Sequence, residues 1–411
     1  MINNQSIFSK NLFNTTVLVS ALGYFVDIYD LILFGIVRIP SLVDLGIKGD
    51  GLITTGVLLL NMQMGGMLIG GIIWGILGDK KGRISVLFGS IFLYSIANFL
   101  NAFVSSTEMY AVLRFFAGVG LAGELGAAIT LVSEVMPKET RGYGTAIVAS
   151  IGVSGAIAAA VVGELFNWKT AYIIGGVLGF LLLIMRIKMF ESGLYKNLKE
   201  INVGKGKFFS LFTSKDRFFR YMNCILIGMP IWFVVGVLIT FSPEFGKVLG
   251  VSETVTAGKS ILFTYLGLIF GDLVSGFLSQ YLKSRKKVFL IFLTMTAIFI
   301  LIYLFVYGLS LFQFYFLCTL LGISIGYWAV FVTTASEIFG TNLRSTVTTT
   351  VPNFIRGTVV PITLSFELLR EYTGMIYAAL IVGLFCLVIA YYALNKLEET
   401  FGKDLNYLEK I

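Results

Sequence analysis

Histidine is absent from the 411 residues, and cysteine, proline and charged residues are scarce. Without histidine, the chain lacks the side chain that most often shuttles protons near neutral pH and most often binds metals. The three cysteines, Cys224, Cys318 and Cys386, lie in apolar runs without metal-ligand spacing, so we expect neither disulfides nor zinc. No glycine-rich phosphate loop is present, so nothing favours ATP as an energy source. We predict no cofactor and no enzymatic activity.

Charged residues make up only 13% of the chain and hydrophobic residues 57%. Soluble domains contain about a quarter charged residues. Apolar runs of about twenty residues recur along the whole chain, and each is long enough to cross a hydrocarbon core of ~30 Å. The first run is too long and too acidic for a cleaved signal peptide, so we expect it to remain as a helix. The composition therefore predicts an all-α polytopic membrane protein embedded in the lipid bilayer.

Positive charge collects in alternate loops of this predicted topology. An N-terminus in the cytoplasm places most lysines and arginines on the cytoplasmic side, as the positive-inside rule requires, so we expect both termini there. The net charge of +8 then reflects these loops and does not indicate a nucleic-acid partner. We predict twelve spans, at about 12–38, 52–77, 84–104, 108–135, 142–166, 168–190, 217–241, 254–282, 288–308, 310–338, 346–369 and 373–395.

An internal repeat divides these spans into two sets of six. Ser133-Glu134-Val135 followed by Arg141 recurs 203 residues later as Ser336-Glu337-Ile338 followed by Arg344. We therefore predict an N-terminal bundle at 1–190, a cytoplasmic connector at 191–216, a C-terminal bundle at 217–395 and a cytoplasmic tail at 396–411. Parallel repeats of this kind place a substrate cavity near the membrane midplane, between the two halves.

The loop between the second and third spans, Gly75-Ile76-Leu77-Gly78-Asp79-Lys80-Lys81-Gly82-Arg83, resembles the cytoplasmic loop signature of the major facilitator superfamily. The stretch from Arg114 to Glu124 resembles the metabolite:proton symporter and sugar porter branches. The first-span pattern Asp27-Ile28-Tyr29-Asp30 resembles the metabolite:proton and aromatic-acid:proton symporters. The second half departs from the pattern, because its equivalent loop at 282–287 lacks the glycines and the aspartate. The resemblance implies a major facilitator fold of two pseudo-symmetric bundles.

The same resemblance implies a lock on the cytoplasmic side, made by charged loop residues while the cavity faces outward. The alternative is that these are ordinary solvated charges, each contributing little. The candidate gate residues are Gly78, Asp79, Arg83, Glu134 and Arg141 in the first half, and Glu337 and Arg344 in the second.

Charges inside the spans are the candidates for proton coupling, since a charge at membrane depth costs roughly 2.5–3.5 kcal/mol on insertion scales. Asp30 and Arg114 both lie roughly 10 Å from the outer membrane surface, at 1.5 Å per residue, so they can pair. The resemblance to sugar porters implies a proton-linked pair at these positions. Asp27 lies on a neighbouring face of the same helix, and either carboxylate could hold the proton. A static ion pair or a helix contact is the structural alternative.

Arg356 lies near the midplane of the eleventh span, where an unpaired guanidinium is costly. It could bind a substrate carboxylate through its forked donors, or it could pair with Asp27 or Asp272. Glu124 and Asp272 could each be a second proton site or a packing contact. The remaining candidate substrate-binding residues are polar or aromatic side chains within the spans: Asn61, Gln63, Tyr265, Tyr327 and Trp328.

Together these features predict a secondary transporter that imports a small polar metabolite with protons, by alternating access. The substrate would be an organic anion, and the protein a monomer in a bacterial inner membrane. Export of drugs or siderophores, driven by protons, is the alternative. A nutrient sensor without transport activity is a third possibility, but the short tail and connector offer no obvious signalling domain.

Overall fold

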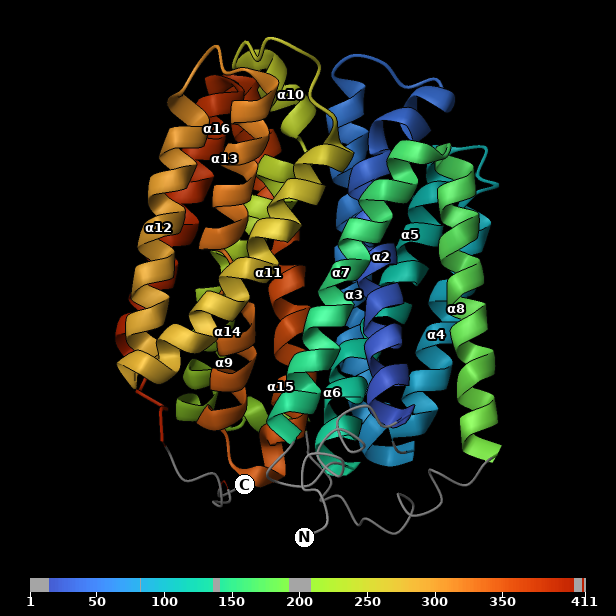
Figure 1. Ribbon diagram of the computed structural model, residues 1–411, viewed down its shortest axis with the longest axis vertical. Helices are drawn as coiled ribbons and strands as arrows, with labels where there is room; N and C mark the ends of the chain where they lie inside the picture. The colour runs from blue at the N-terminus through green and yellow to red at the C-terminus, as the bar shows by residue number, and fades with distance from the viewer. Residues whose placement is uncertain (1–14, 82, 136–140, 192–207, 403–408, 410–411) are drawn as a thin grey trace, which may run out of the picture.

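A computed structural model describes residues 15–81, 83–135, 141–191, 208–402 and 409 of the chain. Within these ranges the regular secondary structure is entirely helical. The helices form two groups that stand side by side and run along the long axis of the molecule (Figure 1). We call the end where α10 lies the upper end, and the end where α6 and α15 lie the lower end.

The first group holds seven helices of the described chain. In order they are α2 (Thr15–Asp44), α3 (Gly51–Lys81), α4 (Arg83–Asn101), α5 (Thr107–Leu121), α6 (Glu124–Val135), α7 (Arg141–Leu165) and α8 (Trp168–Glu191). The second group begins with a 3-10 turn, Phe208–Leu211, and α9 (Lys215–Phe233), whose helix continues as a π-helical segment at Val234–Ile239. It goes on with α10 (Ser242–Val248), α11 (Ala257–Leu282), α12 (Arg285–Phe305), α13 (Leu311–Ser324), α14 (Trp328–Ile338), α15 (Thr341–Gly357) and α16 (Val359–Lys396).

The described helices supply twelve membrane crossings. Ten apolar stretches are long enough to cross a bilayer, and Ser85–Asn101 is a shorter apolar helix. One of the ten, Thr346–Lys396, has 51 residues, which would extend about 75 Å if it were straight. Its helix is interrupted at Gly374, where a φ of 77° suits a residue without a side chain, so this stretch makes two crossings. The predicted polytopic, all-α fold with twelve crossings is confirmed.

The fourth and tenth crossings are each broken near their middle, where the sequence predicted continuous spans at 108–135 and 310–338. In the first half, α5 ends at Leu121 and α6 begins at Glu124. In the second half, α13 ends at Ser324 and α14 begins at Trp328. Leu121 and Ser324 are 203 residues apart, which is the offset of the sequence repeat. The two halves therefore share an irregularity as well as a motif.

Glycines bring neighbouring helices into backbone contact inside each half. A Cβ atom on Gly118 of α5 would lie 2.0 Å from the Gln63 carbonyl oxygen of α3. In the equivalent helix pair of the second half, a Cβ atom on Gly322 of α13 would lie 2.0 Å from the Thr264 carbonyl oxygen of α11. Small residues at such contacts are the usual means by which membrane helices pack.

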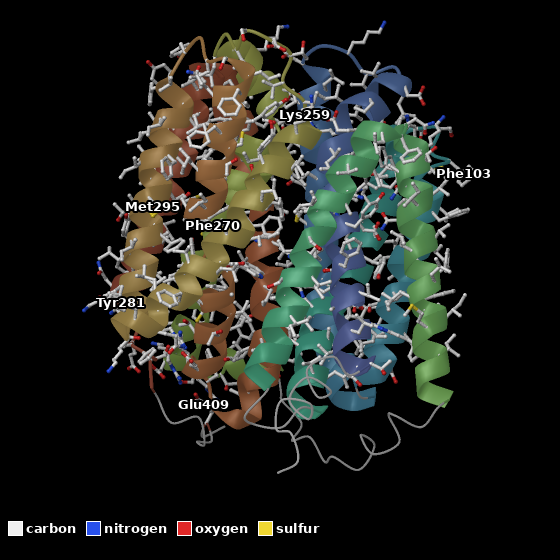
Figure 2. All side chains as sticks on the ribbon, in the orientation of Figure 1. Phe103, Lys259, Phe270, Tyr281, Met295 and Glu409 are labelled. Carbon is white, nitrogen blue, oxygen red and sulfur yellow. The ribbon has the colours of Figure 1, made fainter. Side chains whose placement is uncertain are left out.

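Large apolar side chains cover the sides of the molecule. Figure 2 labels Phe103, Phe270 and Tyr281 among them, and all three are exposed. A soluble protein rarely exposes so much contiguous apolar surface. This exposed belt fits the acyl chains of a bilayer.

Candidate functional site between the two halves

Seven charged side chains of the described structure are at most 3% exposed: Asp27, Asp30, Arg38, Arg114, Glu124, Arg186 and Arg356. Six of them belong to the first half, and only Arg356 belongs to the second. Burying a charge without a partner is costly. A group that has a protein partner therefore belongs to a structural pair, whereas a group that lacks one is available for chemistry.

Asp30 has no hydrogen-bond partner on either carboxylate oxygen, although it is fully buried in α2. It lies against α8, where a Cβ atom on Gly175 would come within 2.3 Å of Asp30 Oδ1. Asn98 and Arg114 lie nearby. Gly175 thus leaves room beside the Asp30 carboxylate, which is buried but held by no hydrogen bond.

Arg114 lies on α5 and binds Gln63 rather than Asp30. Its Nη2 donates to Gln63 Oε1, and its guanidinium lies 4.8 Å from the centre of the Phe34 ring. The Gln63 amide in turn donates to the carbonyl oxygen of Leu31 on α2. The Nε and Nη1 donors of Arg114 have no partner, so the guanidinium is only partly satisfied. Among the described residues, Asp30 and Arg114 are near each other but form no direct ion pair.

Asp27 of α2 and Arg356 of α15 face each other from opposite halves. Arg356 lies within electrostatic range of Asp27, yet both Asp27 oxygens lack hydrogen-bond partners. Arg356 likewise has unpartnered Nε and Nη1 donors, and its guanidinium lies 5.8 Å from the ring centre of Trp232. The structure therefore brings two opposite charges together without joining them.

Aromatic residues surround these two charges. Tyr24, one turn before Asp27, lies beside Trp328 and within the electrostatic range of Arg356. Tyr265 of α11 is buried in the same neighbourhood, close to Tyr24 and Arg356. The structure thus brings Tyr265 and Trp328 to the Asp27–Arg356 level.

Asp272 and Glu124 are held by protein partners. Asp272 accepts a hydrogen bond of 3.1 Å from the Ala329 N–H, in the first turn of α14. Glu124 forms an ion pair with Arg186 of α8, and the Nη1–Oε2 distance is 3.1 Å. A Cβ atom on Gly23 of α2 would collide with this pair. Both carboxylates therefore act as helix contacts in this conformation.

The other two candidates, Asn61 and Tyr327, lie apart from this cluster. Asn61 accepts a hydrogen bond of 2.6 Å from Thr363 of α16, which joins the two halves above Arg356. Tyr327 donates to the Ile227 carbonyl at 3.0 Å and packs between two phenylalanine rings inside the second half.

A buried ion pair joins the halves at the upper end. Arg38 of α2 is 0% exposed, and its Nη2 lies 2.7 Å and 2.8 Å from the two oxygens of Glu244 on α10. The guanidinium also donates to the carbonyl oxygens of Leu52 and Thr240, and it lies 4.5 Å from the centre of the Phe241 ring. We call Arg38 and Glu244 the upper lock.

For most of the predicted lower gate the structure describes the backbone alone, and the side chains lie outside its described part. These residues are Gly78, Asp79, Arg83, Glu134, Arg141 and Arg344. Glu337 is described, and it pairs with Arg285 at 3.1 Å and accepts a hydrogen bond of 2.7 Å from Thr400. These contacts stay within the second half and its tail.

A model of the Major Facilitator Superfamily matches residues 17–357, which is most of the chain. The chain belongs to the Major Facilitator Superfamily. The family and the relatives named below are transporters rather than enzymes. The two helical bundles are thus those of a major facilitator fold.

Several curated transporters of this superfamily resemble the chain. The sialic acid transporter NanX of Escherichia coli is 27% identical over 287 residues, which are 68% of this chain and 68% of NanX. The niacin transporter NiaP of Acinetobacter baylyi is 34% identical over 131 residues, 31% of this chain and 30% of that protein. The benzoate transport protein of the same organism is 30% identical over 181 residues, 42% of this chain and 38% of that protein. The chain thus matches only about a third of the niacin and benzoate transporters.

Sequence reasoning missed Arg38, Glu244, Arg186 and Trp232 of this major facilitator protein. Arg38 stands at the end of a predicted span, where arginines often extend toward the headgroups, and Glu244 falls in a predicted loop. Pro40 follows two residues later and would be expected to end the helix, yet α2 continues to Asp44. The sequence therefore held no signal that Arg38 is buried.

Proposed function

We propose that this major facilitator protein imports a small organic anion together with protons, by alternating access between its two halves. The observation that carries the proposal is the pair of buried, unpartnered carboxylates on α2, Asp27 and Asp30, which face unsatisfied guanidinium groups. A buried charge without a partner persists where function requires it. A proton and an anionic substrate are the two ligands that would satisfy these groups.

Asp30 is the proposed proton carrier. A carboxylate in a dry site favours its neutral form, whereas a nearby guanidinium favours its ionised form. Arg114 is close to Asp30 but tethered to Gln63, so a small movement of α5 against α2 would strengthen or weaken its influence. Water entering from one side would also favour ionisation. Asp30 could thus release its proton in one conformation and take one up in the other.

Arg356 is the proposed anion-binding residue. Its free donors suit a carboxylate, which arginine binds through two parallel hydrogen bonds. Niacin, sialic acid and benzoate, named for three relatives, are all carboxylic acids. This shared chemistry supports an organic anion as the substrate of this chain.

For the topology, we propose that the lower end faces the cytoplasm of a bacterial cell, across the inner membrane. The basic loops of the sequence support this orientation through the positive-inside rule. We retain 1–190 and 217–395 as the two bundles, 191–216 as the connector and 396–411 as the tail. A monomer suffices for this mechanism, because the candidate site lies between two halves of one chain.

Asp30→Asn tests the coupling. In proteoliposomes with an imposed pH gradient, we expect the variant to lose concentrative uptake of a radiolabelled carboxylate that the wild type accumulates. Exchange of internal for external substrate should remain, because it needs no net proton movement. Asp50→Asn is a matched control, since Asp50 is an exposed acid at the upper end. Normal concentrative uptake by Asp30→Asn would refute the assignment, and net efflux by the wild type would favour the exporter.

A further inference from the structure

Three buried hydrogen-bond donors without partners lie together on the second half. They are Nε and Nη1 of Arg356 and the indole Nε1 of Trp232. Trp232 is 5% exposed and Arg356 is 1% exposed, and the guanidinium lies 5.8 Å from the centre of the indole ring. Unsatisfied buried donors are costly. Adjacent donors that lack acceptors form a binding site for an oxyanion.

The facing side of the site offers a free acid. Both oxygens of Asp27 are buried and unpartnered, and Arg356 acts on them from across the interface without a direct contact. Of the other acids nearby, Glu124 pairs with Arg186 and Asp272 accepts the Ala329 N–H, while Asp30, three residues further along α2, lies near Arg114 of the first half. Asp27 is therefore the acid at this level that is free to accept a hydrogen bond from a ligand.

We propose that Trp232 and Arg356 together bind the carboxylate of the substrate, while Asp27 accepts a hydrogen bond from a donor group elsewhere on the same molecule. The inference rests on the proposed function, in which the substrate is an organic anion. It narrows the substrate to small carboxylic acids that also carry a hydroxyl or N–H group. A plain carboxylate would satisfy the donors of the second half but leave Asp27 buried and unpaired.

The proposed site also explains why both halves of the protein contribute residues to substrate binding. A ligand that touches Asp27 on α2, Trp232 on α9 and Arg356 on α15 joins the two halves by its own contacts. Trp232 is then a specificity residue, because it adds a fixed donor that selects an oxyanion. Asp27 is a second specificity residue, because it selects the distal donor.

Matched pairs of acids test the proposal on the purified full-length protein in lipid nanodiscs. The probes are benzoate against 4-hydroxybenzoate, and propionate against lactate, and binding is measured by titration calorimetry. For the wild type, we expect the hydroxylated acid of at least one pair to bind about tenfold more tightly, the discrimination typical of one buried hydrogen bond to a charged group. Equal affinities within both pairs would overturn the role of Asp27.

Variants separate the two roles. Trp232→Phe keeps a ring but removes the N–H, so it should weaken both members of a pair by about five- to tenfold and leave their ratio unchanged. Asp27→Leu should remove the preference within the pair, with Asp27→Asn intermediate. Trp168→Phe is the matched control, since Trp168 binds Asp44 near the upper end. Unchanged affinity in Trp232→Phe would overturn its assignment.

Failure of the proposed function gives a different result. If the pairwise preference and its loss in Asp27→Leu are found, but Asp30→Asn still accumulates substrate, the proton coupling is wrong and the binding site stands. If none of the four acids binds the wild type, both the organic-anion substrate and this site are refuted.

Discussion

The two ends of the molecule close the space between its halves by different means. At the upper end, charged and polar side chains cross from one half to the other: Arg38 to Glu244, Glu164 to Thr256 and Asp50 to Arg370. At the lower end, each ion pair of the described residues stays within one half: Glu124–Arg186 in the first, and Arg285–Glu337 and Arg220–Glu409 in the second half and its tail.

The lower end is joined across the halves by close packing and by an amide. Asn353 of α15 donates to the Ala122 carbonyl at 2.8 Å, at the break between α5 and α6. A Cβ atom on Gly126 would lie 2.5 Å from the Thr349 hydroxyl oxygen. Among the described contacts, opening the upper end separates buried charges, whereas opening the lower end separates closely packed surfaces and an amide hydrogen bond. The two closures should respond to different perturbations.

Breaking the upper lock should have the largest effect. Glu244→Gln removes the charge that compensates Arg38, and an unpaired buried arginine costs on the order of 3 kcal/mol. We expect the population with an open upper end to rise by roughly 100-fold. The measurement is the rate of maleimide labelling of Ser242→Cys, a fully buried position beside the lock. The three native cysteines are buried and should label slowly.

The matched control for the lock is Asp50→Asn. It removes another pair that joins the halves at the upper end, but this pair, with an Nη1–Oδ1 distance of 3.3 Å to Arg370, is open to water because the Asp50 side chain is 90% exposed. This variant should label like the wild type. Equal labelling of Glu244→Gln and the wild type would show that the lock does not hold the upper end closed.

Breaking the amide at the lower end should have a smaller effect in the opposite direction. Asn353→Ala removes the bond to the Ala122 carbonyl, which is worth about 1 kcal/mol. We expect roughly fivefold faster hydrogen exchange in peptides from α6 and α15, with no increase at the upper end. Thr334→Val is the control, because the Thr334 hydroxyl bonds within its own helix. Faster exchange at both ends would contradict independent closures.

A carboxylate at the lower end should make stability depend weakly on pH. Partial burial alone would raise the pKa of Glu399, but hydrogen bonds from the Ser284 hydroxyl and from the backbone N–H of Arg285 hold it below its usual 4.5. A lowered folded pKa stabilises the protein above pH ~4.5, and this contribution is lost as pH falls through the folded value. Glu399→Gln should therefore lower the melting temperature at pH 7 but not at pH 3.

The expected size of this effect is about 0.5–1 kcal/mol at pH 7, as for an anion at a helix N-terminus, here that of α12. Comparison of thermal unfolding of the variant and the wild type across the pH range gives the difference directly. A difference that persisted unchanged in acid would show that Glu399 acts through packing instead of charge.

Added salt should produce the smallest effect on labelling. It should weaken the exposed ion pair at the upper end but not the buried one. Raising the salt concentration from about 0.1 M to 1 M shortens the screening length from about 10 Å to 3 Å. The exposed Asp50–Arg370 pair contributes at most about 1 kcal/mol and should lose it, whereas the buried lock should persist. Labelling of Ser242→Cys in the wild type should therefore change less than twofold, and a larger change would show that water reaches the lock.

The crossings and their pseudo-symmetry could be predicted because apolar length and a repeated motif determine them locally. Asp27 and Arg356 could also be identified, since a charge in an apolar run is conspicuous. Their lack of direct partners could not, because it depends on helix rotation and on contacts between halves. Depth matching brought Asp30 to the level of Arg114, but the Gln63 amide, on a third helix, receives the guanidinium instead.

Other features depend on contacts with no sequence pattern. Arg38 and Glu244 are 206 residues apart in the sequence. Trp232 can be identified as a candidate binding residue only from its contact with Arg356, which lies on another helix. The breaks after Leu121 and Ser324 contain no proline, so propensity alone gave no reason to expect them. Close packing by Gly123 and Gly326 at these breaks is a property of the assembled bundle.

The breaks in the fourth and tenth crossings have a mechanical consequence. Each divides a crossing into two short rods, so α5 can keep its contacts with α3 while α6 tilts with the opposite half, and α13 and α14 can do the same. An unbroken helix would transmit any tilt at one membrane surface directly to the other. The two interrupted crossings instead act as hinges. They allow the helices at one membrane surface to rearrange while those at the other surface stay closed.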